Sequence, residues 1–314
     1  MRICAAADIH YPRTGPGRCE AIAERMCGSG ADVLVLVGDL ATGRGQHHRK
    51  LLRLFRSFTG PKLFVPGNHD LWSTGRRLDA WQRYHVVLKH IAERSGFHYL
   101  PGNPTVINGI GFVGTIGWFD YAFRQVQAPE AGLRVTPIRA RRGRTGPRSE
   151  PIPGRHDVPW GELTDGDYAG QALMWNEGSL RKQLIWNDAV YVSWGAADPE
   201  VTKTLADDLA REAAIVEQQA DRWVGVSHFV PFADLAGETS SNVEVAYVRA
   251  FLGSPVIGEV LASSPKCRLV LCGHRHEQQV RRIGEVVAAN CSVGDGKSGP
   301  LLLTLGDGAG GDRG

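Results

Sequence analysis

The stretch VLVLVGD, residues 33–39, decides the fold class, because five consecutive apolar residues, three of them β-branched, run into a glycine and an aspartate. A short apolar run ended by turn residues is typical of a strand in a layered sheet. The runs Arg2–Ala7 and Lys62–Val65 repeat this pattern, and polar segments with apolar residues at helical spacing separate the three. The alternation predicts a layered α/β fold.

The same pattern continues along both halves of the chain. We expect further strands at Gly96–Leu100, Thr105–Asn108, Ile110–Thr115, Arg222–Val226, Cys267–Cys272, Gln278–Ile283, Val286–Asn290 and Leu301–Leu305. Helices that cover the sheet faces are expected at Cys19–Cys27, Gln46–Phe58, Arg76–Arg94, Val201–Ala220, Val245–Leu252 and Pro255–Ala262. Between Gly117 and Pro199 the pattern is weak, so a separate unit is expected there.

Composition indicates a folded protein without a membrane segment. The chain has 314 residues, 42% of them apolar and 22% charged, which is enough for a sizeable core. No stretch approaches the roughly 20 uninterrupted apolar residues that cross a bilayer. The N-terminal residues contain Asp8, His10 and Glu20 where a signal peptide needs an apolar segment, so we expect a cytoplasmic protein. The six cysteines form no CxxC pair, and we expect reduced, structural thiols.

The positive charge is concentrated in one segment. Residues 134–157 hold seven arginines against Glu150 and Asp157, a net charge of +5, so the rest of the chain carries −2 of the total of +3. This distribution indicates one basic insert and not a nucleic-acid-binding body. We expect residues 117–200 to form an inserted cap with a mobile segment near Arg139–Gly154, and five tryptophans to lie mostly in the cap core (Trp118, Trp160, Trp175, Trp186, Trp194).

Five of the strand-like runs end in side chains that bind metals. They are Asp8 and His10 in ICAAADIH, Asp39 in VLVLVGD, Asn68, His69 and Asp70 in LFVPGNHD, His228 in WVGVSH, and His274 and His276 in RLVLCGHRH. Ligand sites in open α/β sheets gather at the carboxyl ends of strands, so these distant residues are expected to meet in one site. A single DxH or HxH triplet arises by accident, but the ordered set is specific.

Spacing refines this expectation. In an extended chain, residues two apart project to one side, so Asp8 with His10, and His274 with His276, are each expected to point into one pocket. Two such pairs could hold two ions. Glycines at positions 38, 67 and 273 let the backbone turn sharply and approach the site closely.

The ordered set D-x-H, G-D, G-N-H-D, H and G-H-x-H resembles the signature of the calcineurin-like metallophosphoesterase superfamily, over residues 1–115 and about 201–305. The resemblance implies two facing mixed β-sheets sandwiched between helices, a four-layer α/β sandwich. It implies one metal held by Asp8, His10, Asp39 and His276 and another held by Asp39, Asn68, His228 and His274, with Asp39 as the bridge. His69 then lies near the leaving oxygen, and Asp70 orients its imidazole.

The implied chemistry agrees with the residue types. Mixed imidazole and carboxylate ligands favour Mn, Fe or Zn over Mg or Ca. Two such ions lower the pKa of a bridging water and clamp the attacking and leaving oxygens, so a metal-bridging hydroxide attacks phosphorus in line while His69, if protonated, assists the leaving group. We therefore expect a dinuclear hydrolase of phosphoric esters, over a catalytic domain at residues 1–306 that is interrupted by the cap, with a flexible tail at 307–314.

Differences between these motifs and those of other members of the superfamily narrow the range of expected substrates. The chain has GDLATGRG and GNHD where protein phosphatases of the superfamily resemble GDxVDRG and GNHE, which favours a phosphodiesterase or small-molecule phosphatase acting on phosphorylated small molecules or nucleotides. Tyr11, Arg13, Arg44 and the turn Gly114–Tyr121 could line the pocket, whereas histidines outside the motifs, such as His48, are interpreted as surface or helix-capping residues. Two alternatives stay open: a nuclease acting on RNA or DNA, and a catalytically inactive binding scaffold.

Overall fold

The first of two facing β-sheets contains the N-terminal strand of the chain. In the computed structural model, which describes residues 1–42, 45–72, 79–144 and 146–306, its strands lie in the order β16 (Leu301–Thr304), β1 (Arg2–Ala6), β2 (Val33–Val37), β3 (Lys62–Val65) and β4 (His98–Tyr99). Strands β1 to β4 pair in parallel, and β16 pairs antiparallel with β1. The carboxyl ends of four strands therefore meet at one edge.

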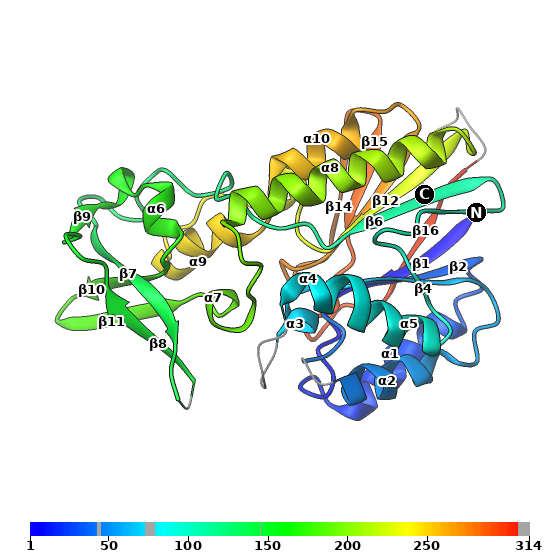
Figure 1. The fold of residues 1–314 in the computed structure, drawn as a ribbon, viewed down its shortest axis with the longest axis horizontal. Helices are drawn as coiled ribbons and strands as arrows, with labels where there is room; N and C mark the ends of the chain where they lie inside the picture. The colour runs from blue at the N-terminus through cyan, green and yellow to red at the C-terminus, as the bar shows by residue number, and fades with distance from the viewer. Residues whose placement is uncertain (43–44, 73–78, 145, 307–314) are drawn as a thin grey trace.

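The second sheet faces the first (Figure 1). Its strands lie in the order β14 (Gln279–Ile283), β15 (Val286–Asn290), β13 (Cys267–Cys272), β12 (Arg222–Ser227), β6 (Ile110–Thr115) and β5 (Thr105–Ile107). The four inner strands are parallel, and the two outer strands pair antiparallel. Both sheets are thus mixed, as the sequence predicts.

The alternation of side chains in β2 explains why the sheets stack. Val33, Val35 and Val37 belong to an apolar layer between the two sheets, with residues of β6, β12 and β13 on the other side. Leu34 and Leu36 point the opposite way and pack in the layer between sheet and helices. Since successive residues of a strand alternate faces, an all-apolar strand is buried on both.

Helices cover the outer faces of both sheets. Figure 1 shows α1, α2 and α5 over the first sheet and α8 and α10 over the second. The bounds of the helices are α1 Pro16–Cys27, α2 Gly45–Leu52, α3 Asn68–Leu71, α4 Ala80–Gln82, α5 Lys89–Arg94, α6 Asp165–Tyr168, α7 Asp188–Tyr191, α8 Asp198–Glu217, α9 Val243–Val248 and α10 Pro255–Ala262. A π-helical segment, Arg83–Leu88, joins α4 to α5. The four layers of helix, sheet, sheet and helix confirm the predicted α/β sandwich.

A third sheet stands apart from the facing pair (Figure 1). Its strands are β11 (Leu180–Ile185), β10 (Gln171–Glu177), β7 (Arg134–Arg142) and β8 (Pro147–Pro151), and β9 (Val158–Pro159) also pairs with β7. Four of the five tryptophans expected in the cap core are buried: Trp118, Trp160, Trp175 and Trp194. All described pairings in this sheet are antiparallel.

The segment near Arg139–Gly154, which is expected to be mobile, contains regular structure. Most of that segment is a hairpin, in which Arg139 of β7 lies opposite Glu150 of β8. Buried Ile138 and Ala140 flank exposed Arg139 in β7, so one face of the strand packs while its arginines reach solvent. The Pro and Gly content obscured this partly alternating pattern in the sequence.

Other expectations hold where the structure describes the residues. All six cysteines are free, and five are buried. No helix within the described ranges is long and apolar enough to cross a membrane. Arg44, the expected helix start at Arg76 and the expected tail at 307–314 lie outside the described residues.

Candidate metal centre

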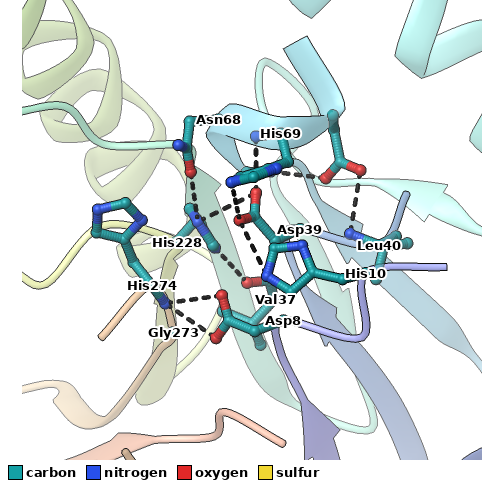
Figure 2. Close-up of polar contacts among 12 residues, drawn as sticks. Asp8, His10, Val37, Asp39, Leu40, Asn68, His69, His228, Gly273 and His274 are labelled. Atoms are coloured by element: carbon teal, nitrogen blue, oxygen red, sulfur yellow. Dashed lines mark hydrogen bonds and ion pairs between the residues drawn. The ribbon is translucent and has the colours of Figure 1, made fainter. Parts of the chain in front are cut away.

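The predicted ligands come together where the carboxyl ends of the two facing sheets meet. The first sheet supplies Asp8 and His10 after β1, Asp39 after β2 and Asn68 after β3, and the second supplies His228 after β12 and His274 and His276 after β13. Figure 2 shows Asp39 near the middle, between His10 on one side and His228 on the other. The ligands were expected at the edge of a sheet, and the structure brings them together from the edges of two sheets.

Five of the seven predicted ligands have left-handed and not extended backbone. Of the eight non-glycine residues with positive φ in the described part of the chain, five are predicted ligands: Asp8 (59°), His10 (49°), Asp39 (53°), His274 (69°) and His276 (58°). The interpretation that the i, i+2 pairs converge through extended backbone is therefore wrong. A non-glycine residue in this region costs on the order of 1 kcal/mol or more, and such residues cluster at functional sites.

Glycine is required where the loops approach one another. A Cβ atom on Gly67 would overlap the Asp39 carboxylate and lie 2.7 Å from His228 Nε2. Gly38 has a φ of 84°, and a Cβ there would overlap the His228 ring. The predicted role of these glycines, close approach of the backbone to the site, agrees with this geometry.

The first donor group consists of Asp8, His10, Asp39 and His276, whose ligand atoms all lie within 4.8 Å of one another. The Nε2 atoms of His10 and His276 are 3.0 Å apart. His10 Nε2 is 3.7 Å from Asp39 Oδ2, and His276 Nε2 is 3.5 Å from Asp8 Oδ1. Two imidazole nitrogens that face two carboxylates form a donor set suited to Mn, Fe or Zn.

The second donor group consists of Asp39, His228 and His274, with Asn68 beside it. His228 Nδ1 donates to the Val37 carbonyl at 2.8 Å, so Nε2 of the neutral ring carries a lone pair. That lone pair faces Asp39 Oδ1 at 3.4 Å and Asn68 Oδ1 at 3.2 Å. Three acceptors that face one another repel unless a cation lies among them, so the residues fit a metal ion. Similarly, His274 Nε2 can donate to the Phe251 carbonyl at 3.2 Å, which leaves Nδ1 for a metal.

Burial makes both groups dependent on cations. Burial, followed by the charges of Asp8 and Asp70, raises the pKa of Asp39 well above its ordinary value. Burial lowers the pKa of His10 to about 4 and also lowers the pKa of His228. The imidazoles of His10 and His228 are therefore neutral at pH 7, the form that binds metal, and a bound cation would keep the Asp39 carboxylate ionised.

His69 lies at the rim of the centre. Its Nε2 is 3.9 Å from Asp39 Oδ2, and its side chain is 17% exposed. Burial, followed by the neighbouring His10 and His274, lowers the pKa of His69 to about 2. The ring is therefore neutral at pH 7, so the group it offers to a bound phosphate is an N–H donor and not a preformed cation.

Asp70 holds loops together and does not orient His69 as expected. Its carboxylate accepts hydrogen bonds from the backbone amides of Leu40 and Ala41 at 3.0 Å and of Gly67 at 2.8 Å. It also lies 2.9 Å from His48 Nε2. These bonds tie the loop after β2 to the loop after β3, so Asp70 fixes the positions of Asp39 and Asn68. The ring that packs on His69 is Trp72, with centroids 3.7 Å apart.

The sequence interpretation missed two residues that support the centre. His48 is fully buried and contacts Asp70, although it is interpreted above as a surface or capping residue. Its spacing of three and four residues before Leu51 and Leu52 on α2 is a signal for a buried face. Asp188, on α7, accepts hydrogen bonds from Asn68 and is buried. No local pattern marks it.

The residues expected to line a substrate pocket fall into two groups, one exposed to solvent and one buried. Tyr11 is partly exposed and Arg13 is exposed at the loop after β1. Trp118 and Tyr121 of the Gly114–Tyr121 turn are buried and donate to Asp198. They also line a cavity of about 730 Å³, which is bounded in addition by Arg139, Arg141 and Asp188.

Comparisons with known proteins agree with this geometry. A model of the calcineurin-like phosphoesterase family matches residues 1–278. No curated protein sequence matches the chain. Among solved structures, the phosphopantetheinyl hydrolase of Mycobacterium tuberculosis is similar, with a TM-score of 0.60, 17% identity, and coverage of 93% of this chain and 89% of that chain.

Two further structures are more distant. The TT1561 protein of Thermus thermophilus has a TM-score of 0.48 and 13% identity, over 93% of this chain and 88% of that one. A dimetal phosphatase from Danio rerio has a TM-score of 0.44 and 11% identity, over 92% and 86%. At these identities structural likeness concerns the fold alone, whereas the family match spans most of the sequence. The chain belongs to the calcineurin-like phosphoesterase family.

Proposed function

We propose that the protein is a dinuclear metal-dependent hydrolase of phosphoric esters, either a phosphodiesterase or a small-molecule phosphatase. The observation that carries this proposal is the position of Asp39, which belongs to both donor groups. A shared carboxylate places two cations next to each other, the arrangement that clamps the attacking and leaving oxygens in phosphoryl transfer. Asp8, His10 and His276 would hold one ion, and Asn68, His228 and His274 the other.

The protein residues determine how the reaction would proceed. The ions would supply Lewis acidity and lower the pKa of the attacking water. The attacking water gives up a proton to solvent, its oxygen forms a bond to phosphorus, and the bond from phosphorus to the leaving oxygen breaks in line with it. His69, with Nε2 facing the centre and its ring held against Trp72, would donate a hydrogen bond from its N–H to the negative charge that develops on the departing oxygen.

Residues 117–200 are proposed to form a cap beside the centre. The cavity of about 730 Å³ lies against this segment, and its wall includes Asp188, which contacts the proposed ligand Asn68. Arg139 and Arg141 line the same cavity. The cap therefore places positive charge on the wall of a cavity that reaches Asp188, the neighbour of Asn68.

A panel of substrates tests the proposal. Purified protein is assayed with bis(p-nitrophenyl) phosphate, p-nitrophenyl phosphate, cyclic nucleotides and oligonucleotides, each with Mn, Fe, Zn or Mg. We expect turnover of a small ester with a transition metal and its loss on chelation. Bound metal without turnover of any ester would support the interpretation as an inactive binding scaffold.

A nuclease is the second candidate, and the exposed arginines of β7 and β8 favour it. Polynucleotide binding that depends on such residues weakens steeply as salt rises. A steep loss of activity with salt on oligonucleotides, but not on p-nitrophenyl esters, would therefore identify a nuclease. Equal salt dependence on both would favour a small-molecule substrate.

A further inference from the structure

Asp188 is a buried carboxylate on α7 that belongs to the proposed cap and yet reaches the metal centre. It is 2% exposed. Its two oxygens accept hydrogen bonds from Asn68 Nδ2 at 2.9 and 3.0 Å, from Trp72 Nε1 at 2.6 Å and from Trp186 Nε1 at 3.0 Å. A buried carboxylate is costly unless several donors satisfy it, and these are all neutral donors.

The bond to Asn68 determines which end of the amide faces the centre. Because Nδ2 donates to Asp188, Oδ1 lies 3.2 Å from His228 Nε2, in the second donor group. A reversed amide would present its NH₂ group there, and an NH₂ group cannot bind a cation. The carboxylate of Asp188 therefore selects the orientation in which Asn68 is a metal ligand.

The other two donors extend this influence. Trp72, held at its edge by Asp188, is stacked between His69 at 3.7 Å and Tyr191 of α7 at 4.9 Å between ring centroids. Trp186, also held by Asp188, stacks on Phe251 at 5.1 Å, and the Phe251 carbonyl lies 3.2 Å from His274 Nε2. Asp188 thus contacts Asn68 directly and reaches His69 through the ring of Trp72. Through the ring of Trp186 it reaches Phe251, whose carbonyl faces His274.

We propose that Asp188 is a positioning residue through which the 117–200 segment completes the second metal subsite. The inference rests on the proposed function, because it concerns an ion held by Asn68, His228 and His274. It gives the proposed cap a second role besides enclosing substrate. The two facing sheets supply all the ligands, and the cap supplies the hydrogen bond that determines the orientation of the Asn68 amide.

Asp198 provides a matched control on the same segment. It is a partly buried carboxylate, and it accepts from Trp118 Nε1 at 2.7 Å, Tyr121 Oη at 2.5 Å and Gln171 Nε2 at 3.0 Å. None of these donors is a proposed ligand. Replacing Asp198 therefore perturbs the cap to a similar degree without touching the orientation of Asn68.

The experiment measures Mn²⁺ binding to metal-stripped wild-type protein, Asp188→Asn and Asp198→Asn by calorimetry, with elemental analysis of each loaded protein. Loss of a group that orients a ligand typically weakens metal affinity about 10–100-fold. We expect Asp188→Asn to weaken one of two ions by that factor and to leave the other unchanged, while Asp198→Asn keeps both. Two ions bound by Asp188→Asn with wild-type affinity would overturn the inference, as would an equal loss in Asp198→Asn.

A double-mutant cycle isolates the route through Asn68. In an Asn68→Ala background, Asp188→Asn is expected to cause only a small further loss of affinity for the second ion, through the Trp186 and Phe251 contacts that lead to His274, and fully additive losses would contradict the inference. If Asp188→Asn does not fold, Asp188→Glu displaces the carboxylate while keeping its charge, and wild-type binding by that variant would be the contrary result. Wild-type protein that binds fewer than two ions would overturn the proposed function together with this inference, whereas a failure confined to the Asp188 variants overturns the inference alone.

Discussion

The two facing sheets and the 117–200 segment contribute to the candidate centre in different ways. In the sheets, each proposed ligand lies within four residues of the end of a buried strand, as Asp39 does after β2 and His228 after β12. The 117–200 segment instead contributes Asp188 from a short helix, α7, which follows β11, a strand of the third sheet without a buried residue. The sheets supply the groups that would bind metal, and the segment supplies a group that orients one of them.

This difference has a physical origin. A ligand at the end of a buried strand inherits its position from the sheet, and the strand is stabilised by apolar burial that is independent of the metal. The position of the Asp188 carboxylate depends instead on hydrogen bonds from Asn68, on α3, and from Trp72, the residue after α3. We therefore expect substitutions in the sheet loops to remove metal or chemistry, and substitutions in the third sheet to change affinity.

The largest effect is expected for Asp39→Ala, which tests the contribution of the sheets. Since Asp39 belongs to both donor groups, its loss should remove both ions and reduce turnover to the background rate. Elemental analysis and the ester assay measure the two outcomes. The exposed Asp32, which lies just before the same strand, provides the control Asp32→Ala. Retention of two ions by Asp39→Ala would break the assignment of a bridging carboxylate.

A smaller effect is expected for His69→Ala, because His69 acts on the leaving group in our proposal. Removing one hydrogen-bond donor to the charge that develops in the transition state typically costs about 10²–10³-fold in rate. The loss should be smaller for a p-nitrophenyl ester, whose leaving group needs less assistance, while metal content stays at the wild-type level. His98→Ala, at an exposed histidine, is the control. Equal losses for good and poor leaving groups would argue against the donor role.

The same contrast explains which features could be predicted from the sequence and which could not. The strand VLVLVGD and its four counterparts are local patterns, so a layered α/β fold and the convergence of the ligands at strand ends could be predicted from them, whereas the two facing sheets were implied by the family resemblance. The role of Asp188 arises from a contact with Asn68, 120 positions away in the chain, and nothing near Asp188 signals it. The left-handed turns at Asp8 and His10 were not predicted either, since strand-end patterns specify where a strand ends but not how the next residues turn.

Glu212 allows the stability of the packed sheets to be tested without a change at the metal centre. It lies on α8, accepts from the Gly102 amide at 2.7 Å, and burial raises its pKa to about 8. A group with a raised folded-state pKa contributes stability that is complete below its unfolded pKa and is lost as pH rises through 8. We expect the wild type to lose on the order of 3 kcal/mol between pH 5 and pH 9 from this group.

Chemical denaturation at both pH values measures that loss. Glu212→Gln should lack the pH dependence and be the more stable protein at pH 9, whereas Glu259→Gln, at an exposed position on α10, should follow the wild type. A wild type and Glu212→Gln with the same pH dependence would show that Glu212 ionises freely in the folded state.

The smallest effect is expected from the arginines of the third sheet. We propose that they steer an anionic substrate, so neutralising four of them should raise KM a few-fold at low salt and flatten its salt dependence. Turnover at saturation should hardly change, because uniform binding affects KM alone. The four are Arg139, Arg141, Arg142 and Arg144.

Neutralising Arg281 and Arg282, which are exposed on β14 of the second sheet, provides the matched control. Kinetics of the fourfold variant indistinguishable from those of the wild type at low salt would reduce the hairpin to a solvated surface without a role in binding. A KM effect of equal size in the β14 variant would instead assign the steering to overall charge.

Metal content and activity of the wild-type protein, measured on one sample, test the central claim most directly. Metal-stripped protein is titrated with Mn²⁺ while hydrolysis of bis(p-nitrophenyl) phosphate is followed, and the bound metal is counted by elemental analysis. We predict that turnover reaches its maximum when about two ions are bound per chain, as two donor groups that share Asp39 require. Full turnover with one bound ion, or with none, would contradict the dinuclear centre.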